Sequence, residues 1–308
     1  MTTATQSRPG RRRCASVAVA VLLCSTIAER ATAAAPSRYL AAADVVYREG
    51  GDPKLQTLDV YSPGVGRGAE ARDKLPVLIY IHGGAMFRGD KRNVGAKPEF
   101  FCGRGWVLVS INYRLSPVVK HPAHVEDAAA AVAWVARNVE RYGGDPERIA
   151  LIGHSAGALI ASLLATDERR LAVYGLGLDT FDSVVLLEGQ EYDLETRMEW
   201  ARRTMPERMA DPYSKFGETP EAWRDVTVVR HVAPGKDIPP VLLVACGVQF
   251  QFYVPGEEST RMLIALWRAG VPAEYFLAES KDHGGVNDDL TSGDAMSRVV
   301  TNFMERRR

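Results

Sequence analysis

Gly153-His154-Ser155-Ala156-Gly157 is a G-x-S-x-G pentapeptide that could carry a nucleophilic serine. It directly follows the apolar run at 149–152 and directly precedes a helix-like stretch of small and apolar residues at 158–164. A strand that turns sharply into a helix presents its central serine on a strained corner, and a Cβ atom on either flanking glycine would collide with neighbouring backbone. The pattern therefore predicts Ser155 as the nucleophile.

A serine hydroxyl is a poor nucleophile near neutral pH, so it needs a base and donors that stabilise the oxyanion formed by its attack. The apolar stretch 77–81 leads into His82-Gly83-Gly84-Ala85-Met86, where glycines allow backbone N–H groups to approach a developing negative charge. This H-G-G segment lies upstream of the serine motif, and the two signals support each other. We expect Gly84, Ala85 and Ala156 to supply the oxyanion hole.

The base must come from the six histidines of the chain. His283, in Asp282-His283-Gly284-Gly285, follows the last predicted strand, where a short loop can return to the edge of the sheet that carries Ser155. We therefore expect His283 to be the general base. The other five histidines have other places in the sequence. His82 lies in the oxyanion loop and His154 in the pentapeptide, His121 and His124 lie at the start of a helix, and His231 lies in a polar interval.

These motifs together resemble the α/β-hydrolases of the hormone-sensitive-lipase-like and bacterial carboxylesterase type. The resemblance rests on 82–84, on Asn112-Tyr113-Arg114-Leu115-Ser116-Pro117, on 153–157 and on 282–284, and it covers roughly residues 40 to 305. It implies the α/β-hydrolase fold, with a mostly parallel eight-stranded sheet between helices, a Ser-His-acid triad and an acyl-serine intermediate. The histidine before Ser155 makes the motif more similar to that of the carboxylesterase and arylformamidase branches than to the G-D-S-A-G motif of lipases.

The acidic member of the triad is missing from its usual place in the family. Relatives carry it just after the strand that corresponds to 240–245, but residues 246–255 contain no carboxylate. Gln249 or Gln251 could orient an imidazole by hydrogen bonding, yet a neutral amide does not stabilise the imidazolium as a carboxylate does. In a serine protease, replacing this acid by an amide costs about 10⁴ in turnover.

Three alternatives remain for the acid. Glu188 ends the strand-like stretch 183–187, and some α/β-hydrolases take their acid from that strand end; Asp193 follows a few residues later. Glu257 or Glu258 could reach back from a helix start, although acidic residues are also common there because the helix dipole favours them. The third alternative is that the chain has no acid and is slow or inactive.

The elements that must position these residues alternate between strand-like and helix-like segments, which predicts a mostly parallel sheet covered on both faces. The stretch 55–61 alternates in apolarity as a half-exposed strand does, whereas 77–81 is typical of a fully buried strand. The other expected strands are 44–48, 106–111, 149–152, 183–187, 240–245 and 273–277. The expected helices are 98–103, 123–142 with a stop at Gly143, 158–164, 257–269 and 294–308.

The interval 190–238 breaks this alternation and is longer than ordinary connections between elements. It contains Trp200, Trp223 and mixed charges, and we expect a small helical cap over the site. The alternative is a surface excursion with no role in binding. Asp127 and Glu126, on the long helix before the serine strand, are expected to be scaffold contacts.

The N-terminus has the features of a secretory signal. Residues 1–33 combine Arg11-Arg12-Arg13, an apolar stretch from Cys14 to Ala28 and Ala31-Thr32-Ala33, which fits a small-x-small cleavage rule. We expect residues 34–308 to form the hydrolase domain, secreted or periplasmic, with no membrane span, because no later run approaches the roughly 20 apolar residues that a span needs. Cys102 and Cys246 are expected to be buried and unpaired, as free cysteines commonly are.

Composition excludes one class of partner. The chain has 38 basic and 38 acidic residues, and without residues 1–33, which hold five arginines and one glutamate, 33 basic residues face 37 acidic ones. This balance is not that of a nucleic-acid-binding protein. No cysteine or histidine cluster has metal-ligand spacing, and no phosphate-binding glycine motif follows a strand. The sequence thus predicts a cofactor-independent serine hydrolase of small carboxylic esters, the alternatives being an arylformamidase-type amidase or a non-catalytic binding protein.

Overall fold

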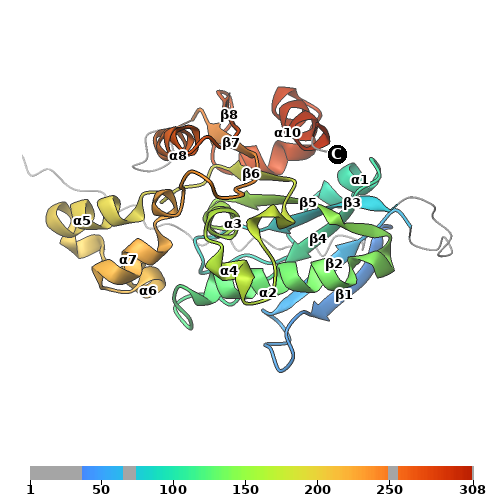
Figure 1. Cartoon of the computed structure of the whole chain (residues 1–308), viewed down its shortest axis with the longest axis horizontal. Coiled ribbons are helices and arrows are strands. Elements are labelled where there is room, and N and C mark those ends of the chain that lie inside the picture. Colours follow the sequence, from blue (N-terminus) through green and yellow to red (C-terminus); the bar gives the residue numbers. More distant parts are fainter. Residues whose placement is uncertain (1–36, 65–73, 249–255, 307–308) are drawn as a thin grey trace, which may run out of the picture. The chain divides into compact units, whose positions relative to one another are not determined.

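The protein is described by a computed structural model that covers residues 37–64, 74–248 and 256–306. The predicted signal segment lies outside these residues and stays a prediction. An eight-stranded sheet with the order β1-β2-β4-β3-β5-β6-β7-β8 forms the centre of the fold (Figure 1). Its strands are β1 (Leu40–Val46), β2 (Thr57–Tyr61), β3 (Leu75–Ile81), β4 (Val107–Ile111), β5 (Gly144–His154), β6 (Ser183–Leu187), β7 (Val241–Cys246) and β8 (Ala273–Ala278).

The sheet is mostly parallel, as the resemblance implies, but two of its strand pairs are antiparallel. Strand β2 runs antiparallel to both β1 and β4, and the pairs from β4 through β3, β5, β6 and β7 to β8 are all parallel. In parallel neighbours the carboxyl ends of the strands meet at one edge, where α/β folds place their sites. All the predicted strands are present, but β1 begins four residues and β5 five residues earlier than expected.

Helices cover both faces of the sheet and bury two apolar cores against it. One core includes Val135 of α2 (Ala123–Asn138), Leu163 of α3 (Ala156–Thr166) and Leu266 of α8 (Glu257–Arg268). The opposite core includes Phe101 of α1 (Lys97–Cys102) and Phe303 of α10 (Ala295–Glu305). Short helices α4 (Arg169–Ala172) and α9 (Gly285–Asp288) complete the layers. This arrangement confirms the predicted α/β-hydrolase architecture.

The prediction of a half-exposed strand at 55–61 was wrong, because all five residues of β2 are buried. The alternating polar position is Asp59, only 3% exposed, whose carboxylate lies 2.7 Å from the Nζ atom of buried Lys91. A buried carboxylate is tolerated when an opposite charge and hydrogen bonds compensate the lost hydration. Alternation in polarity thus reflects a buried ion pair here and not a solvent-facing side of the strand.

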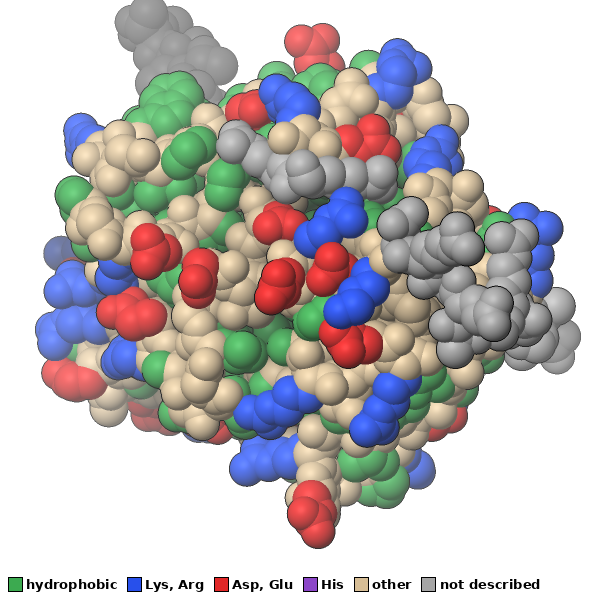
Figure 2. Space-filling view, turned by 45° about the vertical axis from the view of Figure 1, so that its right-hand side comes forward, with side chains coloured by type: hydrophobic (Ala, Val, Ile, Leu, Met, Phe, Trp, Pro, Cys, Tyr) green, Lys and Arg blue, Asp and Glu red, His purple; other side chains and the backbone are tan. Residues whose placement is uncertain are grey.

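Asp127 is a scaffold residue, as predicted. Its fully buried carboxylate accepts two hydrogen bonds from the Arg114 guanidinium, at 2.7 and 2.8 Å, and another from Gln56. Cys102 and Cys246 are both buried and unpaired. Within the described ranges, no helix is both long and apolar enough to cross a bilayer. Figure 2 shows a face on which basic and acidic side chains are interspersed, in keeping with the even charge balance.

The interval after β6 folds into the predicted helical cap. Its helices are α5 (Leu194–Thr204), α6 (Ala210–Phe216) and α7 (Pro220–Val226), which lie together beyond one end of the sheet (Figure 1). Asp225 on α7 joins this cap to the core. Its carboxylate contacts His121 Nε2 at 2.8 Å, Arg169 at 2.8 Å and Arg170 at 2.5 Å. The hydrogen bond from His121, followed by the charge of Arg170, holds the pKa of Asp225 well below its ordinary value.

Asp225→Asn should lower the free energy of unfolding at pH 7 by about 2 kcal/mol, because it removes a charge that three partners share. A carboxyl with a depressed folded-state pKa stabilises above its unfolded pKa near 4 and loses that contribution as the pH falls. Urea unfolding at pH 7, 4 and 3 should therefore show a difference from the wild type that is nearly full at pH 7 and narrows mainly below pH 4. Glu221→Gln on the same helix is the control, and a pH-independent difference would contradict the assignment.

Candidate active site

The pentapeptide forms a tight corner between β5 and α3, as predicted. Ser155 has φ 52° and ψ −119°, a strained conformation for a residue with a side chain. A Cβ atom on Gly153 would lie 2.2 Å from the carbonyl oxygen of Gly157, and one on Gly157 would lie 2.2 Å from that of Ile81. The amide of Ser155 donates to the Leu187 carbonyl at 2.9 Å. Close packing of β3, β5 and α3 therefore holds the serine at the carboxyl edge of the sheet.

His283 reaches Ser155 from the C-terminal part of the chain. It lies in the loop between β8 and α9, and its Nε2 atom is 3.0 Å from the Ser155 Oγ atom. Burial lowers the pKa of His283 below its ordinary value, while the charge of Asp282 raises it. The imidazole is thus favoured in the neutral form, which can accept the serine proton.

His154 fixes the backbone of the catalytic loop, a role that the sequence did not reveal. Its Nε2 atom donates to the carbonyl oxygen of His283 at 2.8 Å, and the two rings lie 5.0 Å apart between centroids. Burial, followed by the nearby His283, lowers the pKa of His154 to about 3. The ring therefore stays neutral, with its proton on the nitrogen that faces the carbonyl. Its place beside the nucleophile is the only signal that the sequence offered.

The remaining histidines have structural partners. His82 stacks on Tyr113 with 4.6 Å between ring centroids, and His124 lies 3.1 Å from the Ser116 hydroxyl. His121 contacts the Asp225 carboxylate, and His231 contacts the Asp225 carbonyl at 2.8 Å. All six histidines belong to the described residues, so His283 is the one that reaches the serine.

The segment after β3 turns back on itself at Gly84. Gly84, Ala85 and Met86 have φ values of 119°, 53° and 65°, and a Cβ atom on Gly84 would lie 2.0 Å from the Arg88 carbonyl oxygen. The amides of Phe87 and Arg88 both donate to the Gly84 carbonyl, at 3.0 and 3.1 Å. Three consecutive left-handed residues direct peptide groups in ways that a strand or helix cannot. Such a turn suits backbone donors that face a negative charge.

Glu188 lies beside the position where relatives carry the acid. It follows β6 with φ 46°, and its Oε2 atom accepts a hydrogen bond of 2.6 Å from the Cys246 amide at the end of β7. Burial raises the pKa of Glu188, and the hydrogen bonds from Cys246 and Gln190 oppose that rise. The side chain of Glu188, just after β6, thus reaches the C-terminal end of the neighbouring strand β7.

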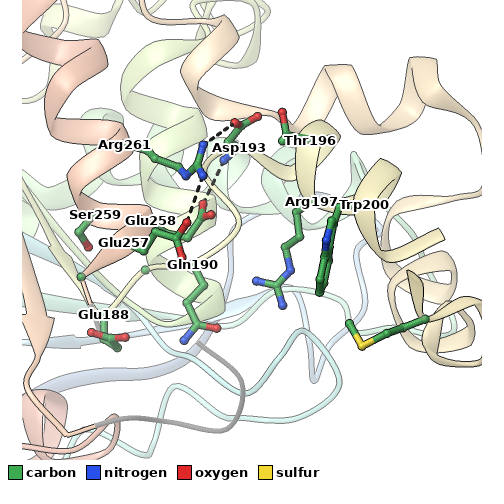
Figure 3. Close-up of a pocket in the computed structure, with 13 residues that line it drawn as sticks. Glu188, Gln190, Asp193, Thr196, Arg197, Trp200, Glu257, Glu258, Ser259 and Arg261 are labelled. Atoms are coloured by element: carbon green, nitrogen blue, oxygen red, sulfur yellow. Dashed lines mark hydrogen bonds and ion pairs between the residues drawn. The ribbon is translucent and has the colours of Figure 1, made fainter. Parts of the chain in front are cut away.

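The other candidate acids interact with one another on α5 and α8 (Figure 3). Arg261 contacts Glu257 at 3.1 Å and Asp193 at 3.6 Å, and Glu258 accepts a hydrogen bond of 3.2 Å from the Asp193 amide. These contacts account for them without the triad. Gln249 and Gln251 lie outside the described residues.

Five of the six predicted site residues share one cavity of about 630 Å³, whereas Glu188 lines a different cavity. Ser155, Ala156, His283, Gly84 and Ala85 line its floor. Its other walls come from the cap helices and the turn between them, including Trp200, Ala201, Met205, Met209 and Phe216. The cap is therefore part of the binding cavity, and the alternative of a surface excursion without a role is not supported. Among the described residues, no group of three or more histidine, cysteine or acidic side chains is arranged to hold a metal ion.

Comparisons with known proteins agree with this geometry. The BD-FAE family matches residues 58–192. Esterase LipC of Mycobacterium tuberculosis is 33% identical over 220 residues, which are 67% of this chain and 51% of LipC. Carboxylesterase NlhH of the same organism is 41% identical over 108 residues, or 34% of this chain and 32% of NlhH. The chain thus spans about half or less of the length of these curated relatives.

Solved structures support the fold. Esterase B from Lactobacillus rhamnosis has a TM-score of 0.66 at 22% identity, covering 86% of this chain and 84% of the esterase. Thermogutta terrifontis esterase 2, phosphonylated by sarin, has a TM-score of 0.61 at 22% identity, covering 88% of this chain and 94% of that one. The serine corner, the sheet order and these relatives together assign the chain to the α/β-hydrolases of the carboxylesterase type.

Proposed function

We propose that this chain is a secreted serine hydrolase that cleaves carboxylic esters through an acyl-serine intermediate. The observation that carries the proposal is the 3.0 Å approach between the Ser155 Oγ atom and the His283 Nε2 atom, within hydrogen-bond reach for proton transfer. Export is supported by the signal-like features of residues 1–33. The cavity volume of about 630 Å³ favours a small or medium ester.

The proposed reaction has two halves. His283 takes the serine proton as Ser155 attacks the ester carbonyl, and the backbone amides of Gly84, Ala85 and Ala156 stabilise the oxyanion. The tetrahedral intermediate collapses as the C–O bond to the alcohol breaks, and His283 returns the proton to that alcohol. A water molecule then attacks the acyl-serine with His283 as base, releasing the acid and restoring Ser155.

Glu188 is our proposed orienter of His283. Support comes from its place at the end of β6, from its bond to the Cys246 amide and from its left-handed backbone, since strained residues gather at functional sites. The hydrogen bonds from Cys246 and Gln190 oppose the rise in the pKa of Glu188 that burial causes, and so favour its ionised form. An ionised Glu188 would stabilise the imidazolium that forms during attack.

Ser155→Ala should reduce hydrolysis of p-nitrophenyl acetate by at least about 10³-fold, because no other group can form the acyl intermediate. A fluorophosphonate probe should label the wild type and spare the variant, as peptide mass spectrometry would show. Ser214→Ala, at a half-buried cap position that does not line the cavity, is the control. Absence of labelling in folded wild-type protein would favour the binding-protein alternative, and preference for N-formylkynurenine would favour the amidase.

Glu188→Gln should lower kcat by at least about 10²-fold while thermal unfolding changes little, because the amide oxygen can still accept from the Cys246 amide but carries no charge. Glu257→Gln is the matched control, since this exposed glutamate contacts Arg261 and not β7. Steady-state kinetics with p-nitrophenyl acetate provide the readout. An unchanged kcat in Glu188→Gln would exclude this residue as the triad acid.

The acidic limb of the kcat/KM profile should have an apparent pKa below the ordinary histidine value of about 6.5. Burial lowers the pKa of His283, so the neutral, base-competent ring persists to more acid pH. Activity is then lost only as the pH falls through that lowered pKa. Rates measured from pH 4.5 to 8 in buffers of constant ionic strength test this, and a limb centred at or above pH 7 would contradict it.

A further inference from the structure

The loop that carries His283 continues into a single helical turn, α9, which has its own contacts with the core. The amide of Asn287 donates to the Gly284 carbonyl at 2.9 Å, and that of Val286 donates to the Asp282 carbonyl at 3.2 Å. These bonds connect the residues on either side of His283 directly to α9. A displacement of Asn287 is therefore transmitted to the proposed base through one turn of backbone.

Two buried side chains hold Asn287, and they come from elements far apart from it in the sequence. Tyr80 of β3 is only 2% exposed and donates its hydroxyl to Asn287 Oδ1 at 2.8 Å. Lys97, the first residue of α1, is 3% exposed and donates its ammonium to the Asn287 carbonyl at 3.2 Å. The same ammonium lies 4.8 Å from the centre of the Tyr80 ring, in a cation–π contact. Asn287 is thus held both at its side chain and at its backbone.

A buried ammonium is costly, so its presence needs a reason beyond packing. Burial lowers the pKa of Lys97 to about 8, and the charge of Asp288 opposes this fall, so the side chain is still mostly protonated at pH 7. Among the described residues, this ammonium contacts a carbonyl oxygen and an aromatic ring but no carboxylate. An apolar side chain of similar length would avoid the cost of burying a charge. Stability alone therefore does not account for a lysine at this position.

The other contacts that hold this loop lie before Asn287 in the sequence. The amide of Gly247 donates to the Lys281 carbonyl at 3.2 Å, and His154 donates to the His283 carbonyl at 2.8 Å. These contacts fix the loop from Lys281 up to His283. Asn287 is the next fixed point, so the His283 ring is held from both sides along the chain.

We propose that Lys97 and Tyr80 are positioning residues for His283. By fixing Asn287, they keep the His283 ring within reach of the Ser155 hydroxyl. This inference deepens the proposed esterase function and rests on it. Neither Lys97 nor Tyr80 lines the cavity that contains Ser155, so both act through the loop and not on the ester. Loss of either contact should therefore lower kcat, whereas KM depends on cavity walls that stay in place.

The test compares conservative variants of the full chain. Tyr80→Phe removes one hydroxyl, and Lys97→Met keeps an unbranched side chain without its charge. Each should lower kcat for p-nitrophenyl acetate about 10-fold with KM nearly unchanged, because even a small misplacement of a reacting group is costly. Labelling by a fluorophosphonate should slow by a similar factor. Val300→Ala, on α10 in the same apolar core as Tyr80, is the control for lost stability and should lower Tm without changing kcat.

A double-mutant cycle separates the two contacts with Asn287. Asn287→Ala removes the Oδ1 acceptor and keeps the backbone carbonyl. Adding Tyr80→Phe to this variant should therefore cause no further loss of kcat, because the hydrogen bond between the two side chains is already gone. Adding Lys97→Met should still lower kcat about 10-fold, since its acceptor is retained.

Hydrogen exchange provides a readout that does not depend on turnover. Peptides that contain residues 282–288 should exchange faster in Tyr80→Phe and Lys97→Met, and peptides from α3 should not. Values of kcat and labelling rates within about twofold of an active wild type in both variants would overturn the inference and leave the esterase function intact. If Lys97→Met does not fold, Tyr80→Phe decides alone. A folded wild type that neither hydrolyses the ester nor reacts with the probe would contradict the esterase function, and the inference with it.

Discussion

The close approach of three backbones at the serine corner is the constraint on which the rest of the site depends. β3, β5 and α3 come so near each other that side chains at Gly153 and Gly157 would overlap carbonyl oxygens at 2.2 Å. This packing stabilises a strained Ser155, since the two buried cores on either side of the sheet oppose any relaxation of the corner. Ser155 is thus positioned by the sheet before any substrate binds, which is what the proposed catalysis by preorganised groups requires.

The same corner also positions His283, the proposed base. His154, the residue before Ser155, donates to the carbonyl of His283 and so helps to hold His283 beside the serine. A carboxylate at position 154 could not make this bond at neutral pH, because it has no proton to donate to a carbonyl. The histidine therefore suits a loop in which the backbone needs a neutral donor. A triad acid fixes the ring, whereas His154 fixes the chain that carries it.

Sequence patterns predicted the helices and most strands, because their apolar spacing and glycine stops are local properties. They failed for β2, because its polar residue Asp59 is buried. Lys91, which is distant in the sequence, neutralises the Asp59 carboxylate. The proximity of Ser155 and His283 was predictable for a similar reason, since each of them follows its own strand within a few residues. The link from His154 to the His283 carbonyl and the reach of Glu188 to β7 were not, because both depend on pairings between elements that lie far apart in the sequence.

The cap contributes charged side chains to the wall of the cavity that contains Ser155. In the proposed reaction an oxyanion and an imidazolium form close together and nearly cancel, so charges on the cap, some distance away, change the energy of the reaction little. The charges of the cap can therefore vary without altering the proposed catalytic pair. The cap helix α5 packs on the core through Leu194 and Met198, and Asp225 on the neighbouring α7 adds ion pairs to the helix after α3. The fold thus places the proposed reacting groups at the edge of the sheet and a large part of the cavity wall on the cap.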